Sequence, residues 1–115
     1  MKIGIIITQP FDPEAGGVQR VTDSISKIFT TFEHQVMIIS LNTKVVENDK
    51  NTIPVINVTN KKQLGNILKK EKFNILINQQ GYSIKLTKLL LKNKPNDDMY
   101  IINCLHINPL NFVDN

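Results

Sequence analysis

The stretch "ITQPFDPEAGGVQRVTDSISKIF", from Ile7 to Phe29, decides the fold, because it joins an apolar strand to a helix through a polar loop. The preceding run, Lys2 to Thr8, is β-branched almost throughout, which is typical of a strand buried on both faces of a sheet. Gly16 and Gly17 stand where the loop becomes a helix. Backbone N–H groups at a helix start have no helical partner, so this junction either holds an anion or simply lets the chain turn.

Helical spacing of apolar residues follows the two glycines, from Val18 to Phe32. We expect one side of this helix to face the core, namely Val21, Ile25, Ile28, Phe29 and Phe32. The other side is expected to face water, and it consists of Thr22, Asp23, Ser26 and Lys27.

Strands and helices alternate along the rest of the chain. Apolar runs predict strands at 35–41, 55–58, 74–78 and 99–105. Helical patterns predict one helix that starts after Thr59 or Asn60 and another over about 82–93. Such alternation implies right-handed crossovers between parallel strands. The predicted fold class is therefore α/β, a Rossmann-like parallel sheet with helices on both faces.

Composition narrows the class of protein. The chain has 115 residues, of which 41% are hydrophobic, enough for one small domain with a core. Its net charge of +4 comes almost wholly from lysine, with Arg20 the single arginine, so we do not expect a nucleic-acid partner. The basic balance leaves a weak attraction to anionic membrane surfaces open. Because Cys104 is the single cysteine, no internal disulfide can form, and we expect a cytoplasmic protein.

Three polar groups follow the predicted strands: the loop 9–17, the turn 78–82 and His106. The carboxyl ends of parallel strands lie at one edge of a sheet, where ligands bind. We therefore expect these groups to converge into one site. His106 either hydrogen-bonds a ligand or caps backbone groups at the strand end.

Each remaining candidate also has a structural interpretation. Arg20 either reaches a phosphate or forms a helix salt bridge with Asp23. The turn after the fourth strand either offers hydrogen bonds to a hydroxyl-rich ligand or only reverses the chain, and its candidates are Asn78, Gln79, Gln80 and Tyr82. Two isolated histidines and one cysteine have no metal-ligand spacing, so no metal site is predicted.

The ordered set of motifs resembles the opening of retaining, nucleotide-sugar-dependent glycosyltransferases of family 4. Those chains begin with an apolar strand, a loop closing in Gly-Gly-x-(Glu/Gln)-Arg, an amphipathic helix, and Gly-His-x-Val before a second strand. The matching residues here are Gly16, Gly17, Gln19, Arg20, and then "EHQV" at 33–36, where Glu33 replaces the family's glycine. "FNILINQQGY" and "YIINCLHINPL" are similar to the family's fourth strand with its turn and to its fifth strand with a following histidine.

This resemblance implies the N-terminal, acceptor-side half of a GT-B enzyme, with the active site in a cleft between two Rossmann-like halves. It implies that Gly16, Gly17 and Arg20 approach the donor diphosphate and that His106 approaches the transferred sugar. The acceptor, a glycan or a lipid-linked molecule, is expected at Asn78, Gln79, Gln80 and Tyr82. The nucleotide sugar is a substrate, and no cofactor is implied.

The resemblance also implies that residues 1–115 are an incomplete N-terminal domain whose nucleotide-binding C-terminal domain is absent. We therefore expect no transferase activity from this chain alone. An exposed inter-domain surface makes self-association an expectation too. Peripheral contact with the inner face of the membrane is a further expectation for a lipid-linked acceptor.

A second class of protein shares this pattern: a non-catalytic receiver-like signalling or binding domain of flavodoxin-like fold. That class needs paired acidic residues after the first strand and a phosphorylatable aspartate after the third. Here Thr8-Gln9 follows the first strand, and Asn57-Val58 ends the third. The signalling interpretation is therefore the weaker of the two.

Overall fold

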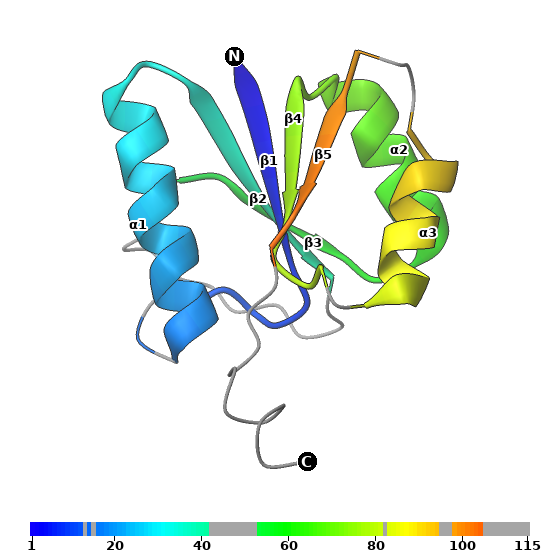
Figure 1. The fold of residues 1–115 in the computed structure, drawn as a ribbon, viewed down its shortest axis with the longest axis horizontal. Coiled ribbons are helices and arrows are strands. Elements are labelled where there is room, and N and C mark those ends of the chain that lie inside the picture. The colour runs from blue at the N-terminus through cyan, green and yellow to red at the C-terminus, as the bar shows by residue number, and fades with distance from the viewer. Residues whose placement is uncertain (13, 15, 42–52, 82, 95–97, 105–115) are drawn as a thin grey trace, which may run out of the picture.

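The computed structural model describes residues 1–12, 14, 16–41, 53–81, 83–94 and 98–104. This part of the chain forms one five-stranded parallel sheet (Figure 1). Its strands are β1 (Lys2–Ile7), β2 (Gln35–Leu41), β3 (Val55–Val58), β4 (Ile75–Asn78) and β5 (Tyr100–Asn103). The spatial order is β3-β2-β1-β4-β5, which confirms the predicted fold class.

Helices cover both faces of this sheet. Helix α1 (Gly17–Thr31) lies against one face, and helices α2 (Lys61–Glu71) and α3 (Ile84–Lys92) lie against the other (Figure 1). The predicted strands and helices agree with these bounds to within two residues wherever the structure describes their ends. No helix in the described ranges is long and apolar enough to cross a bilayer.

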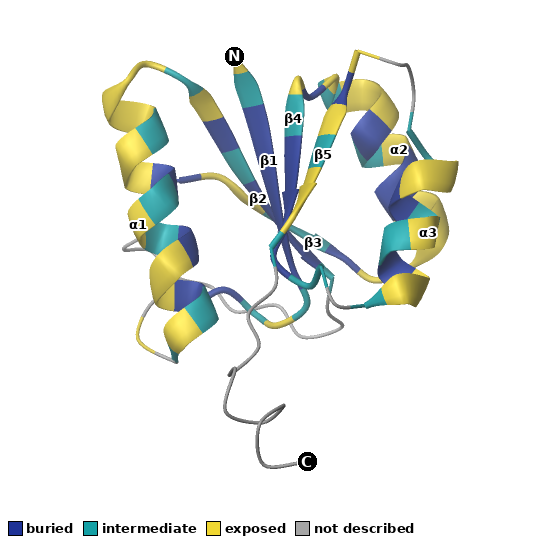
Figure 2. Cartoon of the chain, in the orientation of Figure 1, coloured by how far each residue is buried: buried dark blue, intermediate teal, exposed yellow. Residues whose placement is uncertain are grey.

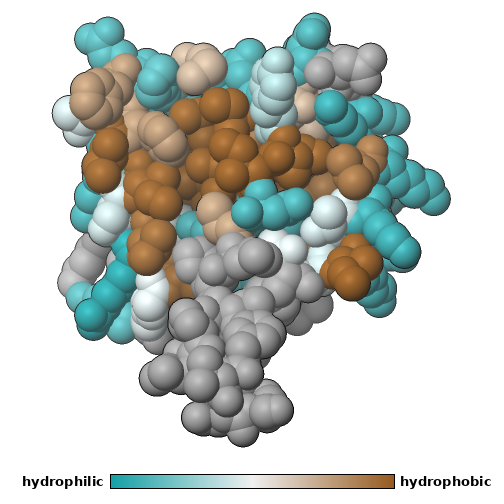
Figure 3. Space-filling view, in the orientation of Figure 1, coloured by the Kyte–Doolittle hydropathy of each residue, from teal (hydrophilic) through white to brown (hydrophobic). Residues whose placement is uncertain are grey.

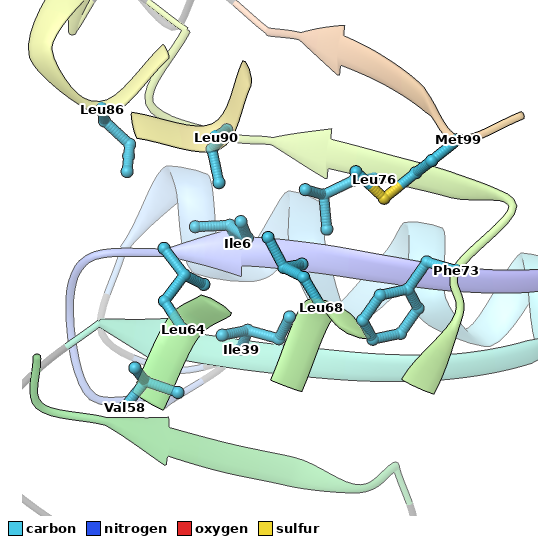
Figure 4. Close-up of a cluster of buried hydrophobic side chains, with 10 residues drawn as sticks. All are labelled: Ile6, Ile39, Val58, Leu64, Leu68, Phe73, Leu76, Leu86, Leu90 and Met99. Carbon is cyan, nitrogen blue, oxygen red and sulfur yellow. The ribbon is translucent and has the colours of Figure 1, made fainter. Parts of the chain in front are cut away.

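Two hydrophobic cores lie on the two faces, so β1, β2 and β4 are largely buried on both sides, whereas β5 is mostly exposed and the helices show water-exposed backs (Figure 2). The core beneath α2 and α3 joins side chains from every layer on that side: Ile6, Ile39, Val58, Leu64, Leu68, Phe73, Leu76, Leu86, Leu90 and Met99 (Figure 4). The core on the α1 side consists of Ile3, Ile5, Ile7, Phe11, Val36, Ile38, Ile53 and Ile77.

An ion pair ties the first strand to the end of α2. The Lys2 ammonium group donates a hydrogen bond to the Glu71 carboxylate and lies 5.8 Å from the centre of the Phe73 ring. The hydrogen bond from Lys2 holds the pKa of Glu71 below its ordinary value.

The strand order contradicts the flavodoxin-like fold that the signalling alternative requires. A flavodoxin-like domain has the order 2-1-3-4-5, whereas this sheet places β2 between β3 and β1. The chain therefore runs outward from β1 to β3 and then returns to β4 on the other side of β1. This order is that of the first five strands of the Rossmann fold, and the flavodoxin-like alternative was wrong.

The predicted inner face of α1 was correct for Ile25 and Phe29, which pack against the core, and wrong at other positions. Its buried residues are Gln19, Thr22 and Ser26, whereas Ile28 is 55% exposed and Phe32 is 69% exposed. The hydroxyls of Thr22 and Ser26 each donate to a backbone carbonyl one turn earlier, at 2.8 and 2.7 Å, which lets these small polar residues face the sheet.

Because α1 turns Thr22 and Ser26 toward the sheet, some of its apolar side chains lie at the surface. Figure 3 shows apolar groups over α1 and across the sheet toward β5. The exposed large apolar residues of α1, its C-cap and β5 are Val21, Ile28, Phe32, Tyr100 and Ile102. Apolar surface of this kind is typical of a region that another part of a protein covers.

Helix α1 ends in a Schellman motif built on an unusual residue. The His34 N–H donates to the Phe29 carbonyl and the Glu33 N–H to the Thr30 carbonyl, each at 3.0 Å. Such a motif needs a left-handed residue after the helix, and Glu33 has a φ of 66°. Glu33 therefore adopts a conformation that glycine would adopt without strain.

Replacing Glu33 by glycine should accordingly stabilise the domain. We expect Glu33→Gly to raise the free energy of unfolding by up to about 1 kcal/mol, because it removes the strain of a side chain at positive φ. Urea unfolding measures the change, and Glu33→Val is the matched control, which should lower stability. A loss of stability in Glu33→Gly would contradict the left-handed assignment.

Candidate functional site

The candidate site lies at the carboxyl edge of the sheet, between β1 and β4. The strand order reverses direction there, and this switch point is where open α/β sheets bind ligands. Two connections leave the sheet at this point: the loop from β1 to α1 and the turn from β4 to α3 (Figure 1). They are the first two of the three groups that the sequence predicts to converge.

The glycine pair begins α1. Gly16 has φ 155° and ψ −175°, a conformation that is almost confined to glycine, and Gly17 is the first helical residue. No side chain of the described residues caps this helix, and the Arg20 N–H makes the first helical bond, to the Gly16 carbonyl at 3.0 Å. A Cβ added at either glycine would meet no atom of the described residues within 4 Å. Within that part of the chain, the helix start is therefore open to a ligand.

Gln19 holds the β1–α1 loop in place. Its side chain is buried, its Oε1 accepts the Asp12 N–H, and its Nε2 donates to the Gln9 Oε1 at 3.1 Å. The Gln9 carbonyl in turn accepts the Ser40 hydroxyl at 2.7 Å, from the end of β2. The loop is thus fixed to both its own helix and the neighbouring strand.

A buried hydrogen bond joins α1 to the turn after β4. The Gln79 Nε2 donates to the Thr22 Oγ1 at 2.9 Å, and both side chains are fully buried. The Gln79 N–H also donates to the carbonyl of Ile6 in β1, at 3.1 Å. Gln79 therefore connects the turn after β4 both to α1 and to β1.

The turn after β4 is shaped by Asn78 and closed by Gly81. The fully buried Asn78 amide donates to Asn103 Oδ1 at 3.1 Å, and its Oδ1 accepts the Gln80 N–H at 3.0 Å. The Gly81 N–H donates to the Cys104 carbonyl at 3.0 Å. A Cβ at Gly81 would come within 2.8 Å of that carbonyl oxygen, so this turn has no room for a side chain.

The predicted site residues differ in what they offer a ligand. Gly16, Gly17 and Arg20 lie together at the start of α1, and Arg20 is exposed. Its alternative partner Asp23 instead pairs with Lys27 at 2.8 Å, and within the described ranges Arg20 makes no ion pair.

In the β4–α3 turn, the Asn78 and Gln79 side chains are buried, whereas Gln80 is half-buried. His106 and Tyr82 lie outside the described residues, so their roles stay predictions. No cluster of three histidine, cysteine or acidic side chains able to hold a metal ion occurs in the part of the chain that the structure describes.

Sequence reasoning missed the residues that hold the site together. Thr22 was placed on the wrong side of α1, and Gln9 and Ser40 were not singled out. A signal did exist for Thr22: Val18, Thr22 and Ser26 are small or β-branched residues four apart, so they share one face of the helix.

Comparison with solved structures finds a similar fold in a glycosyltransferase. The chain superposes on AviGT4, a glycosyltransferase involved in avilamycin A biosynthesis, with a TM-score of 0.62 and 11% identity. The match covers 92% of this chain and 32% of that one. The two share a fold. No protein-family model and no curated protein matches the sequence.

The close contact at Gly81 predicts a large effect from a small substitution. We expect Gly81→Ala to lower the free energy of unfolding by about 1–3 kcal/mol, because the new methyl group would push against the backbone after β5. Gly17→Ala is the matched control, since its methyl group meets open space and should change stability by no more than about 0.5 kcal/mol. Equal stability of the two variants in urea unfolding would contradict the assigned packing.

Proposed function

We propose that this chain is the acceptor-side, N-terminal part of a GT-B glycosyltransferase. The parent enzyme would move a sugar from a nucleotide-sugar donor to a glycan or lipid-linked acceptor, with retention of anomeric configuration. One observation carries the proposal: an uncapped helix start with two unobstructed glycines lies at the β1/β4 switch point. The shared fold with AviGT4 supports it.

In this proposal the donor diphosphate lies against the start of α1. The N–H groups there would donate to phosphate oxygens, and the positive end of the helix dipole would stabilise their charge. The exposed Arg20, one turn into the helix, would supply a further charged hydrogen bond. The open space at Gly16 and Gly17 supports this placement, because a ligand can approach their backbone.

The chemistry follows from holding the diphosphate as a leaving group. The acceptor hydroxyl would attack the anomeric carbon on the face from which the nucleoside diphosphate leaves. The donor phosphate would take the hydroxyl proton, and the helix start would stabilise the developing negative charge. His106 is proposed to contact the transferred sugar. The donor is a substrate, and the reaction as proposed uses no cofactor and no metal.

On the acceptor side, burial divides the four candidates. Asn78 and Gln79 are fully buried and hydrogen-bonded, so we assign them to shaping the turn. Gln80 and Tyr82 are the proposed contacts to acceptor hydroxyls. All four residues thus stay in the proposed acceptor site, two of them as structural residues and two as acceptor contacts.

The rest of the parent protein is also part of the proposal. The chain spans about a third of the glycosyltransferase that it superposes on. A C-terminal nucleotide-binding domain is proposed to complete the cleft, and further parts of the protein to cover the exposed apolar surface of α1 and β5. Without them we propose that the chain is inactive and self-associates. A cytoplasmic location, with peripheral contact to the membrane, suits a lipid-linked acceptor.

Titration with UDP, followed by NMR of the ¹⁵N-labelled chain, tests the donor site directly. We expect saturable shifts of the Gly16, Gly17 and Val18 amides, with a Kd near the millimolar range, about −4 kcal/mol. Gly17→Val should abolish these shifts, because its side chain would occupy the path of the phosphate.

Two controls make the result specific. Uridine, which has no phosphate, should leave the three amides unmoved, and thermal unfolding should show that Gly17→Val stays folded. If UDP moves no amide at the start of α1, or if folded Gly17→Val binds it as well as the wild type, the glycine pair is only a turn.

A further inference from the structure

A groove lies beside the proposed donor site, on the α2 and α3 side of the sheet edge. Two adjoining hollows form it, of about 310 and 210 Å³, and they share Leu41, Lys61 and Leu89. The larger reaches Val58, Thr59 and Leu64, and the smaller reaches Thr8, Ser83 and Lys85. Because Thr8 follows β1 directly, the groove adjoins the β1–α1 loop.

The floor of the groove is apolar. Val58, Leu64 and Leu86 form the end of the hydrophobic core at which the strands terminate (Figure 4). Leu41 and Leu89 pack against the same core and remain partly exposed within the groove. A purely hydrophilic sugar would leave this surface without a partner, whereas an apolar group would bury it.

Two lysines line the groove at helix starts, where a positive charge is unfavourable. Lys61 is the first residue of α2 and Lys85 the second residue of α3, so both lie at the positive ends of helix dipoles. Neither helix has an acidic residue in its first turn. Within the described ranges, neither lysine forms an ion pair.

The helix starts themselves are already capped. Asn60 Oδ1 accepts the Gln63 N–H at 2.9 Å, and Ser83 Oγ accepts the Leu86 N–H at 3.3 Å. An anion in the groove would therefore be held chiefly by the two ammonium groups. A pair of lysines matches the charge of a phosphate, between one and two negative charges.

We propose that this groove binds an acceptor whose phosphate group is attached to an apolar body. The phosphate would lie between Lys61 and Lys85, and the apolar body would lie on the leucine floor. This inference rests on the proposed function, because it names the acceptor class of that enzyme. It depends on different residues from the donor site, so the two can fail independently.

Titration of the ¹⁵N-labelled chain with monomeric octyl phosphate tests the groove. We expect saturable shifts of the Thr8, Lys61 and Lys85 amides. Inorganic phosphate and the neutral octyl glucoside serve as probes of the two halves of the ligand, and each should bind at least roughly tenfold more weakly.

Charge variants give the matched control. Lys61→Gln and Lys85→Gln should each weaken octyl phosphate binding roughly three- to tenfold, and added salt should weaken it further. Lys62→Gln removes a charge from the same helical turn but outside the groove, and should leave binding unchanged.

Several outcomes would overturn the inference. Equal binding of octyl glucoside would show an apolar groove that ignores charge, and equal binding of inorganic phosphate would show an anion site that ignores the apolar body. Equal weakening by Lys62→Gln would show only a general attraction to a basic protein. If UDP still shifts the Gly16 and Gly17 amides in any of these cases, the donor site stands and only the acceptor class fails.

Discussion

One buried hydrogen bond sets the geometry on which the site depends. The Gln79 amide of the β4–α3 turn donates to the Thr22 hydroxyl of α1, at 2.9 Å, and neither side chain is reached by water. Leaving a buried polar group without a partner costs about 1–3 kcal/mol, so this contact strongly favours one rotation of α1 on the sheet. That rotation turns Thr22 and Ser26 inward and puts the apolar residues Ile28 and Phe32 at the surface. The hydrogen bond between Gln79 and Thr22 therefore accounts both for the geometry of the site and for the exposure of Ile28 and Phe32.

The same rotation fixes what a ligand meets at the sheet edge. Gln19 ties the β1–α1 loop to the helix, and Gly16 then turns the chain so that the helix start opens toward the switch point. On the opposite face, α2 and α3 bring two lysines to an apolar groove beside β1. Donor and acceptor are thus proposed to approach the end of β1 from its two sides. A transferase needs this arrangement, because both substrates must meet at one carbon atom.

Much of the fold is predictable from the sequence, because hydrophobic period alone separates its strands from its helices. The run "QVMIISL" predicts the full length of β2, and Asn60 is one of the two residues that the sequence offers as the cap of α2. The strand order cannot be predicted from the hydrophobic period, because a flavodoxin-like and a Rossmann-like sheet share the same alternation of strands and helices. The prediction of the inner face of α1 was wrong at Thr22 and Ser26 for a different reason. Thr22 and Ser26 are polar by composition but satisfied by bonds to their own helix and, for Thr22, to Gln79, a partner 57 residues away.

A double-mutant cycle on Thr22 and Gln79 tests the central claim, that this contact locks α1 to the β4–α3 turn. Thr22→Val and Gln79→Met each remove one partner while keeping volume, and each should lower the free energy of unfolding by about 1–3 kcal/mol. The double variant should lose clearly less than the sum of the two single losses, because each single substitution already breaks the hydrogen bond between the two side chains. Losses that add to within about 0.5 kcal/mol would show that the two residues act separately, and would contradict the account.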